Sequence, residues 1–518
     1  MILDQREIRW DRSRVAPLHL IPLINDRASL IGPRHSLPLT LTGTMSGDQI
    51  QNLDQSPAPD LLVRPVGGTE YSWCKAVPVG TGVTVLALLL RKPPDSSLVL
   101  SALHGLQTTH PILRSKLHFD AATNSFSFLT PPVPHLVISA FDLDSTSEIL
   151  RGSGEKGSPA PTRFQQIIEH EMSRNPWTEL DPSVDSDWDV LHASAYSLEE
   201  GRCVVALRLH TAACDRAAAA ALLRELLALV VGGEGAGKGN NGGEEGVNVE
   251  IEKLIPSGKA DKPFWARGLN MLGYSLNSLR MAHLDFIEPG SPRASQLVRL
   301  QMNADDTRRL LAGCESRGVK LCAALAAAAL IAAHSSKDLP DKKWEKYSVV
   351  TLINCRSILD PVLPAQSAGF YHSAIMNSHD ICGGEELWEL AERTYTAYVG
   401  TKDNDKHFSD MGDLNFLMCR AIENPGLTPS ASMRTAFVSV FEDSIIDESS
   451  PLQLQQEIEL EDYMGCASVH GVGPSIAIFD TVRDGQLDCA CVYPSPLHSR
   501  EQMTKLVDDM RRILIGSD

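Results

Sequence analysis

The stretch Cys203–Leu226, CVVALRLHTAACDRAAAAALLREL, is the feature that most constrains how this 518-residue chain can fold. Its first part alternates, so that valine and leucine side chains fall on one face of a strand and Arg208 and His210 on the other. Asp215 comes next, and a segment rich in alanine and leucine, which favour helix, follows directly. A strand that leads straight into a helix is typical of a fold that mixes the two.

The same alternation continues along the chain. Val83–Leu90 is a short apolar run typical of a buried strand, and a helix capped by Asp95 or Ser96 is expected after it. His135–Ile138 is predicted to form another strand. In the second half, the alanine-rich stretch Leu321–Ala333 and the amphipathic segment Ser499–Ile515 predict helices among further strands. The sequence therefore predicts an α/β fold, of the mixed α+β kind, in two halves of similar size.

Compositional changes divide the chain into four parts. Residues 1–57 are rich in proline, arginine and serine without a sustained period, and we expect a disordered amino-terminal extension. Residues 232–246 (GGEGAGKGNNGGEEG) are typical of a flexible linker. The predicted half-domains are therefore residues 58–231 and 247–518. Length alone would suggest three domains at about 150 residues each.

Charge and cysteine usage exclude several classes of protein. Lys and Arg total 47 and Asp and Glu total 65, for a net charge of −18, which disfavours binding to nucleic acid or to an anionic membrane surface. The apolar stretch Leu321–Ala333 is shorter than the about 20 residues of a bilayer span, so none is predicted. Eleven cysteines lack metal-finger spacing and indicate reduced thiols. We expect a cytoplasmic protein, favour a monomer, and predict neither a metal site nor a permanently bound cofactor.

Three motif-like stretches are better explained without a ligand. Gly232 and Lys238 match the start of a phosphate-binding loop, but Gly239 replaces the hydroxyl residue that would bind magnesium. The stretch 407–413, HFSDMGD, imitates a metal-ligand cluster, and a solvated loop is the favoured interpretation. His372, in GFYHSAI, could border a cleft, although a structural role is the favoured interpretation.

His210 is the candidate catalytic residue that the residues alone suggest. A histidine at the end of a strand suits a general base, because its pKa is near neutrality and the backbone holds its ring. Asp215, five residues later, could fix the loop through an arginine, so that the histidine points into a channel.

The strand–His–Asp–helix segment resembles the CoA-dependent acyltransferase superfamily, which includes chloramphenicol acetyltransferase, plant BAHD acyltransferases, alcohol acetyltransferases and condensation domains. Other segments resemble it in the same order over residues 64–515: LVLSALHGLQTTHPILRSKL, GVKLCAALAAAALIAA, VVTLINCRSILDPVLPAQSAGFYHSAI and DGQLDCACVYP. RPVGGTEYSWCKAVP and KPFWARGLNMLGYSLNSL are similar to an uncharacterised plant branch of alcohol-acetyltransferase-like or condensation-like proteins. The resemblance implies two chloramphenicol-acetyltransferase-like half-domains with a channel between them.

The chain departs from the superfamily's HHxxxDG motif. In that motif the second histidine, four residues before the aspartate, is catalytic. Here His210 matches the first histidine, Thr211 takes the catalytic position and Arg216 replaces the glycine. Threonine cannot act as a base near neutral pH. The HxxxD motif is therefore degenerate: either His210 has taken over the catalytic role, or the usual acid–base chemistry is missing.

Two hypotheses follow from the resemblance. The first, which we favour, is an acyltransferase that moves an acyl group from a thioester, with acyl-CoA as co-substrate, to an alcohol or amine. It would use His210 as base, Asp215 as a structural carboxylate and Ser439, in FVSVF, as oxyanion donor; residues that bind the co-substrate are not identified. The second is a catalytically silent relative that binds a ligand or a partner, because Thr211 occupies the catalytic position.

Overall fold

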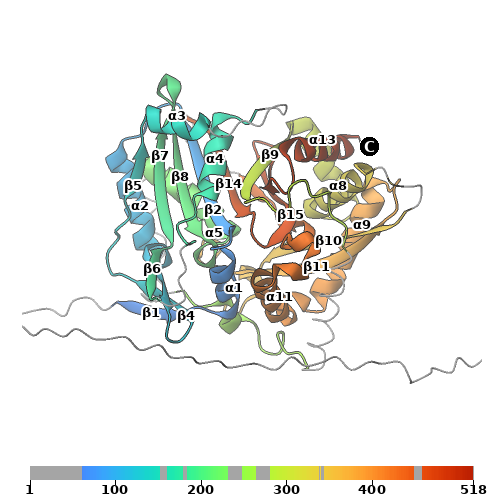
Figure 1. Ribbon diagram of the computed structural model, residues 1–518, viewed down its shortest axis with the longest axis horizontal. Coiled ribbons are helices and arrows are strands. Elements are labelled where there is room, and N and C mark those ends of the chain that lie inside the picture. Colours follow the sequence, from blue (N-terminus) through green and yellow to red (C-terminus); the bar gives the residue numbers. More distant parts are fainter. Residues whose placement is uncertain are drawn as a thin grey trace, which may run out of the picture. The chain divides into compact units, whose positions relative to one another are not determined.

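The computed structural model describes residues 61–151, 160–178, 184–231, 248–263, 281–337, 339, 343–447 and 458–516 (Figure 1). The predicted extension, 1–57, and the predicted linker, 232–246, lie outside these residues. The boundaries predicted for the two half-domains stay a prediction.

The described residues form eleven α-helices and three sheets. The helices are α1 Gly68–Ala76, α2 Ser96–Thr109, α3 Leu143–Arg151, α4 Arg163–Ser173, α5 Arg216–Val230, α7 Ala304–Ser316, α8 Leu321–Ser335, α9 Leu387–Asp403, α10 Lys406–Ser409, α11 Met411–Glu423 and α13 Arg500–Ile515. The strands are β1 Leu62–Pro65, β2 Thr81–Leu90, β3 Lys116–Asp120, β4 Ser125–Thr130, β5 Ile138–Phe141, β6 Ser186–Asp189, β7 Leu191–Ser197, β8 Cys203–His210, β9 Ala294–Met302, β10 Glu345–Asn354, β11 His372–Ile381, β12 Arg434–Phe441, β13 Ile445–Asp447, β14 Leu460–Val469, β15 Gly473–Arg483 and β16 Gln486–Ser495.

The first large sheet has the strand order β14-β2-β8-β7-β5, and Figure 1 shows these strands side by side. Strand β14, late in the sequence, pairs antiparallel with β2, so the two halves of the chain share this sheet. Strand β8 pairs antiparallel with β2, with His210 opposite Val83. Both faces of β8 are buried, because α2 and α5 cover one face, and α4 together with strands β9, β15 and β16 packs on the opposite one.

The alternation of β2 and β8 assigns their side chains to two cores. Leucines and valines at even positions of β2 and odd positions of β8 pack against α2 and α5, together with Leu103 and Leu222. The intervening residues, such as Val83 and Val204, pack against α4 and against the second large sheet. The predicted division of the two faces of β8 is thus confirmed. This division decides on which side of the sheet the candidate residues lie.

The second large sheet has the order β11-β10-β12-β15-β16-β9, with β13 paired to β15. Strand β12 pairs in parallel with β10 and with β15, and β13 also runs parallel to β15. The pairs β10–β11, β15–β16 and β16–β9 are antiparallel. Its outer face packs against α7, α8, α9 and α13, three of which Figure 1 labels together at the right. The small side chains of α8 let it lie in the centre of this core, where nearly all its residues are buried. A third, four-stranded sheet has the order β1-β4-β3-β6.

Most predicted elements are present, and two predictions are corrected. The prediction of a strand over His135–Ile138 was wrong in its bounds, because β5 begins only at Ile138. The stretch 407–413 is not a solvated loop: it spans α10 and the start of α11, and His407 is buried. Lys262 compensates the charges of this stretch, at 2.6 Å from Asp410 and also within ion-pair distance of Asp413.

No single helix among the described residues is long and apolar enough to cross a bilayer. Only α7 and α8 together meet the length and composition criteria, and they are bent by 105° relative to each other.

Candidate functional site

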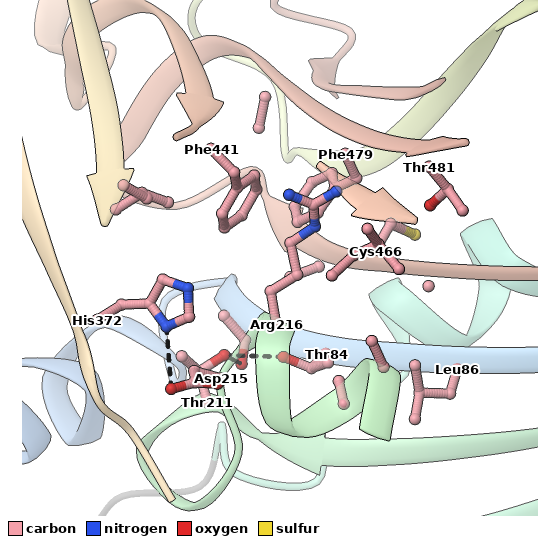
Figure 2. Close-up of a pocket in the computed structure, with 18 of the residues that line it drawn as sticks. Thr84, Leu86, Thr211, Asp215, Arg216, His372, Phe441, Cys466, Phe479 and Thr481 are labelled. Carbon is pink, nitrogen blue, oxygen red and sulfur yellow. Dashed lines mark hydrogen bonds and ion pairs between the residues drawn. The ribbon is translucent and has the colours of Figure 1, made fainter. Parts of the chain in front are cut away.

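A cavity lies where the first and second large sheets meet, and Figure 2 shows the side chains around it. The space between its lining atoms, open solvent included, is about 1210 Å³. Both halves of the sequence contribute to the wall, which is mostly apolar. The wall includes Thr84, Leu86, Thr211, Asp215, Arg216, Ala220, Leu223, Arg224, His372, Ser439, Phe441, Asp447, Cys466 and Phe479. The cavity therefore lies between the two halves, where the resemblance places a channel.

Asp215 is a buried structural centre at the edge of this cavity. As the N-cap of α5 it accepts a hydrogen bond from the Ala218 N–H (2.9 Å), and it accepts another from the Tyr371 N–H (2.7 Å). The Arg356 guanidinium donates to both carboxylate oxygens, at 2.9 and 3.1 Å. Although burial alone would raise the pKa of this carboxyl, Arg356 and the neighbouring His372 hold it well below its usual range. The contacts with Arg356 and Tyr371 join the two halves of the chain at Asp215.

Thr211 lines the cavity, and its hydroxyl proton is already engaged in a hydrogen bond within the protein. Its hydroxyl donates to the Gly82 carbonyl at 2.6 Å, and Thr84 Oγ1 lies 3.0 Å away. Since the Thr211 proton is engaged with Gly82, Thr84 must donate in the second bond. The two hydroxyls thus satisfy each other and the backbone. The position that is catalytic in the superfamily motif is filled here by a closed pair of threonines.

His210 lies outside the cavity, on the opposite face of the first sheet. It pairs across the strands with Val83, whereas the cavity wall includes Thr84 and Leu86, which belong to the other face of β2. The ring is fully buried and packs edge-on against Trp177, with centroids 5.2 Å apart. Its Nδ1 accepts from the Ala212 N–H at 3.2 Å, and Nε2 has no hydrogen-bond partner among the described residues. Burial lowers the pKa of His210 to about 3.

The geometry does not support the base role predicted for His210. A base must come within hydrogen-bond reach of the proton that it removes. The sheet itself separates this imidazole from the cavity, because one step along a strand turns a side chain to the other face. His210 and Asp215, which the sequence predicts to act together, are therefore not brought together.

His372 is the histidine that the structure brings to the cavity. It begins β11, and its Nδ1 lies 2.9 Å from Oδ2 of Asp215. Phe441 packs against the ring edge-on at 6.1 Å, and Phe370 lies 6.2 Å away on the preceding turn. The sequence offered a weak signal, a histidine in a segment of family-like pattern. The signal did not include its proximity to Asp215, which depends on how the two halves pack.

Ser439, the predicted oxyanion donor, also lines the cavity. It lies on β12, two residues before Phe441, and is buried. Its role stays a prediction. A thiol nucleophile is disfavoured at Cys466, the cysteine in this wall, because burial raises the pKa of that thiol to about 12.

The cations of the cavity are paired with acids. Arg216, at the position of the superfamily's glycine, extends across the cavity (Figure 2), with its guanidinium carbon 4.1 Å from the Phe441 ring centroid. It donates to Asp480 Oδ1 at 3.1 Å. Arg224 donates to the Ile446 carbonyl at 2.8 Å and lies 3.9 Å from Asp447. A ligand that carries phosphates would therefore have to compete with carboxylates for these cations. Within the described residues, no group of three or more His, Cys, Asp or Glu side chains could hold a metal ion.

The chain is similar to known proteins in its structure. No family model matches the chain, and no curated protein does. Trichothecene 15-O-acetyltransferase TRI3 from Fusarium sporotrichioides is similar, with a TM-score of 0.63 and 12% identity over 88% of this chain and 94% of that one. Polyketide synthase associated protein 5 from Mycobacterium tuberculosis has a TM-score of 0.58 and 19% identity over 88% and 97%.

A condensation domain is also similar to this chain in structure. The first condensation domain of the calcium-dependent antibiotic synthetase has a TM-score of 0.54 and 14% identity over 88% of this chain and 96% of that one. These likenesses confirm the predicted mixed α/β fold of two lobes. The chain therefore has the fold found in trichothecene 15-O-acetyltransferase TRI3 and in this condensation domain.

Proposed function

We propose that this protein moves an acyl group from a thioester to an alcohol or amine acceptor in the cavity between its two large sheets. The observation that carries the proposal is the cavity itself. It is walled by both halves, it is mostly apolar, and the degenerate motif residues Thr211 and Asp215 lie in its wall. Apolar side chains such as Leu223 and Phe479 suit an acyl chain. The likeness to acyltransferases adds support at the level of fold.

The paired cations bear on how the acyl donor would bind, whereas the choice of donor comes from the resemblance in sequence. Acyl-CoA is the co-substrate that we propose, bound during turnover and released as CoA. Because Arg216 and Arg224 already contact Asp480 and Asp447, the phosphates of CoA would gain little from them. The pantetheine arm and the acyl chain would then supply most of the binding. We therefore expect an acyl N-acetylcysteamine thioester, which lacks the phosphates, to support a rate within about tenfold of the acyl-CoA rate.

A second candidate function is a silent module that binds an apolar ligand. Two observations favour it: Thr211 occupies the catalytic position of the motif, and His210 faces away from the cavity. In that case the thioester or the acceptor would bind without turnover. Thr211→His separates the two candidates, because thiol release that appears only in this variant would show a competent cavity whose base has been lost.

The experiment that tests the function is a thiol-release assay. The purified protein is incubated with acyl-CoA from acetyl to palmitoyl, with a panel of alcohols and amines, and the acylated product is verified by mass spectrometry. Ala220→Trp fills the cavity from α5, and Ala217→Trp is the matched control, a half-buried alanine of the same helix outside the cavity wall. We expect Ala220→Trp to abolish acceptor-dependent release and Ala217→Trp to retain it. Equal rates in the two variants would contradict the assignment of the cavity.

A further inference from the structure

The cavity holds an imidazole in contact with the structural aspartate. The side chain of His372 is 6% exposed, and its Nδ1 lies 2.9 Å from Oδ2 of Asp215. This is a contact at ion-pair distance, because Nδ1 has no hydrogen-bond partner of regular geometry among the described residues. Three donors hold the carboxylate in place: the Ala218 N–H, the Tyr371 N–H and the Arg356 guanidinium. Asp215 is therefore a fixed, ionised group against which the ring can be oriented.

This orientation selects the form of the neutral ring. A carboxylate beside Nδ1 favours the tautomer that carries its proton on Nδ1, and this leaves a lone pair on Nε2. Figure 2 shows the second ring nitrogen of His372 on the side turned away from Asp215, toward the space bordered by Phe441 and Arg216. The lone pair thus faces the cavity, as a general base requires.

We infer that His372, oriented by Asp215, is the general base of the acyl transfer, in place of the histidine that Thr211 replaces. This inference rests on the proposed function. The base has moved from the end of β8 to the start of β11, on the other half of the chain, and Asp215 is the fixed point that both arrangements would share. The Arg356 guanidinium keeps Asp215 ionised, so the carboxylate can also stabilise the imidazolium that forms during the reaction.

The chemical step balances without a further reactant. Nε2 of His372 removes the proton of the acceptor hydroxyl or amine as the acceptor atom forms a bond to the thioester carbonyl carbon. The tetrahedral intermediate then collapses, its C–S bond breaks, and the imidazolium returns the proton to the leaving sulfur. The products are an ester or amide and a free thiol, and His372 is neutral again.

The test compares two buried histidines of one strand. His372→Asn places an amide nitrogen where Nδ1 lies, which retains a donor for Asp215 but provides no base. His379→Asn is the matched control, because His379 is also buried on β11 but lies outside the cavity wall. We expect His372→Asn to lower kcat at least about 100-fold, the usual minimum for loss of a general base, with KM within about twofold. His379→Asn should leave both unchanged. A kcat for His372→Asn within threefold of wild type would overturn the inference while the acyl-transfer function stands.

A chemical measurement on the wild-type protein keeps the two proposals distinguishable. Diethyl pyrocarbonate acylates neutral imidazole nitrogens, and peptide mass spectrometry reports the rate at each histidine. We expect His372 to react at least about tenfold faster than His379, which is equally buried, and than the fully buried His210, and we expect Ala220→Trp to slow the reaction of His372. If wild type transfers no acyl group from any thioester tested, the proposed function fails. Labelling of His372 no faster than that of His379 would show, independently, that no free nitrogen faces the cavity.

Discussion

Removal of the Arg356 guanidinium should destabilise the protein more than a surface substitution can. The group is 2% exposed and donates to both oxygens of Asp215, and to the Ser367 carbonyl at 2.8 Å. Arg356→Met retains the aliphatic part of the side chain and removes the charge. Asp215 then keeps only the Ala218 and Tyr371 N–H groups and the His372 ring near it.

The magnitude follows from the burial of the pair. Loss of one partner of a buried ion pair costs about 3–5 kcal/mol, because the other charge stays buried without compensation. The remaining N–H donors to Asp215 place the expected loss in the free energy of unfolding near the lower end, at about 3 kcal/mol. Asp215→Asn retains the helix cap and removes the opposite charge. In the double variant neither charge remains, so its loss should be about 2 kcal/mol smaller than the sum of the two single losses.

Urea unfolding, followed by circular dichroism and by tryptophan fluorescence, measures these losses at pH 7. The pKa of Asp215 lies below its usual range in the folded protein, so its contribution is fully present above the ordinary pKa of about 3.9. It is lost as the pH falls through the lower folded value. The difference between wild type and Arg356→Met should therefore be constant from pH 8 to 5 and shrink in stronger acid. A loss under about 1 kcal/mol, or additive single losses, would refute the view that this pair joins the two halves.

Two further predictions concern stability. The pKa of His210 is about 3 in the folded protein and about 6.5 when unfolded, so the unfolded chain binds one more proton between these values and stability falls as the pH falls. His210→Asn should make the slope of the unfolding free energy from pH 6 to 4 shallower by about 1.4 kcal/mol per unit, and unchanged slopes would contradict the burial of this ring. Gly82 has a φ of +95°, and an added Cβ would lie 2.9 Å from Trp73 and 3.0 Å from Thr211. Gly82→Ala should therefore reduce the free energy of unfolding by at least about 1 kcal/mol and lower the melting temperature. Gly105→Ala, inside helix α2, should raise the melting temperature. A higher melting temperature in both variants would contradict the role of the positive φ at Gly82.

Local patterns were sufficient for most of the elements. The alternation in Cys203–His210 predicted β8, and the alanine-rich stretch predicted α8, because both periods are set by neighbouring residues. The structural role predicted for Asp215 came from its match to the aspartate of the superfamily motif, not from a periodicity of its neighbours. The stretch 407–413 was misjudged because its charges are compensated by Lys262, which is distant in sequence.

The candidate site depended on contacts that no local pattern contains. The sequence placed a histidine beside an aspartate on the motif's register, but strand alternation sends His210 to the far face of the sheet. The histidine that reaches Asp215 is His372, which lies far from it in the chain and comes near only through the packing of β11. The amino-acid sequence by itself thus determined the α/β composition, the order of the segments and the loss of the motif's catalytic histidine. Only the tertiary structure decided which imidazole faces the cavity, because the direction of a side chain follows from strand register and from the packing of one half on the other.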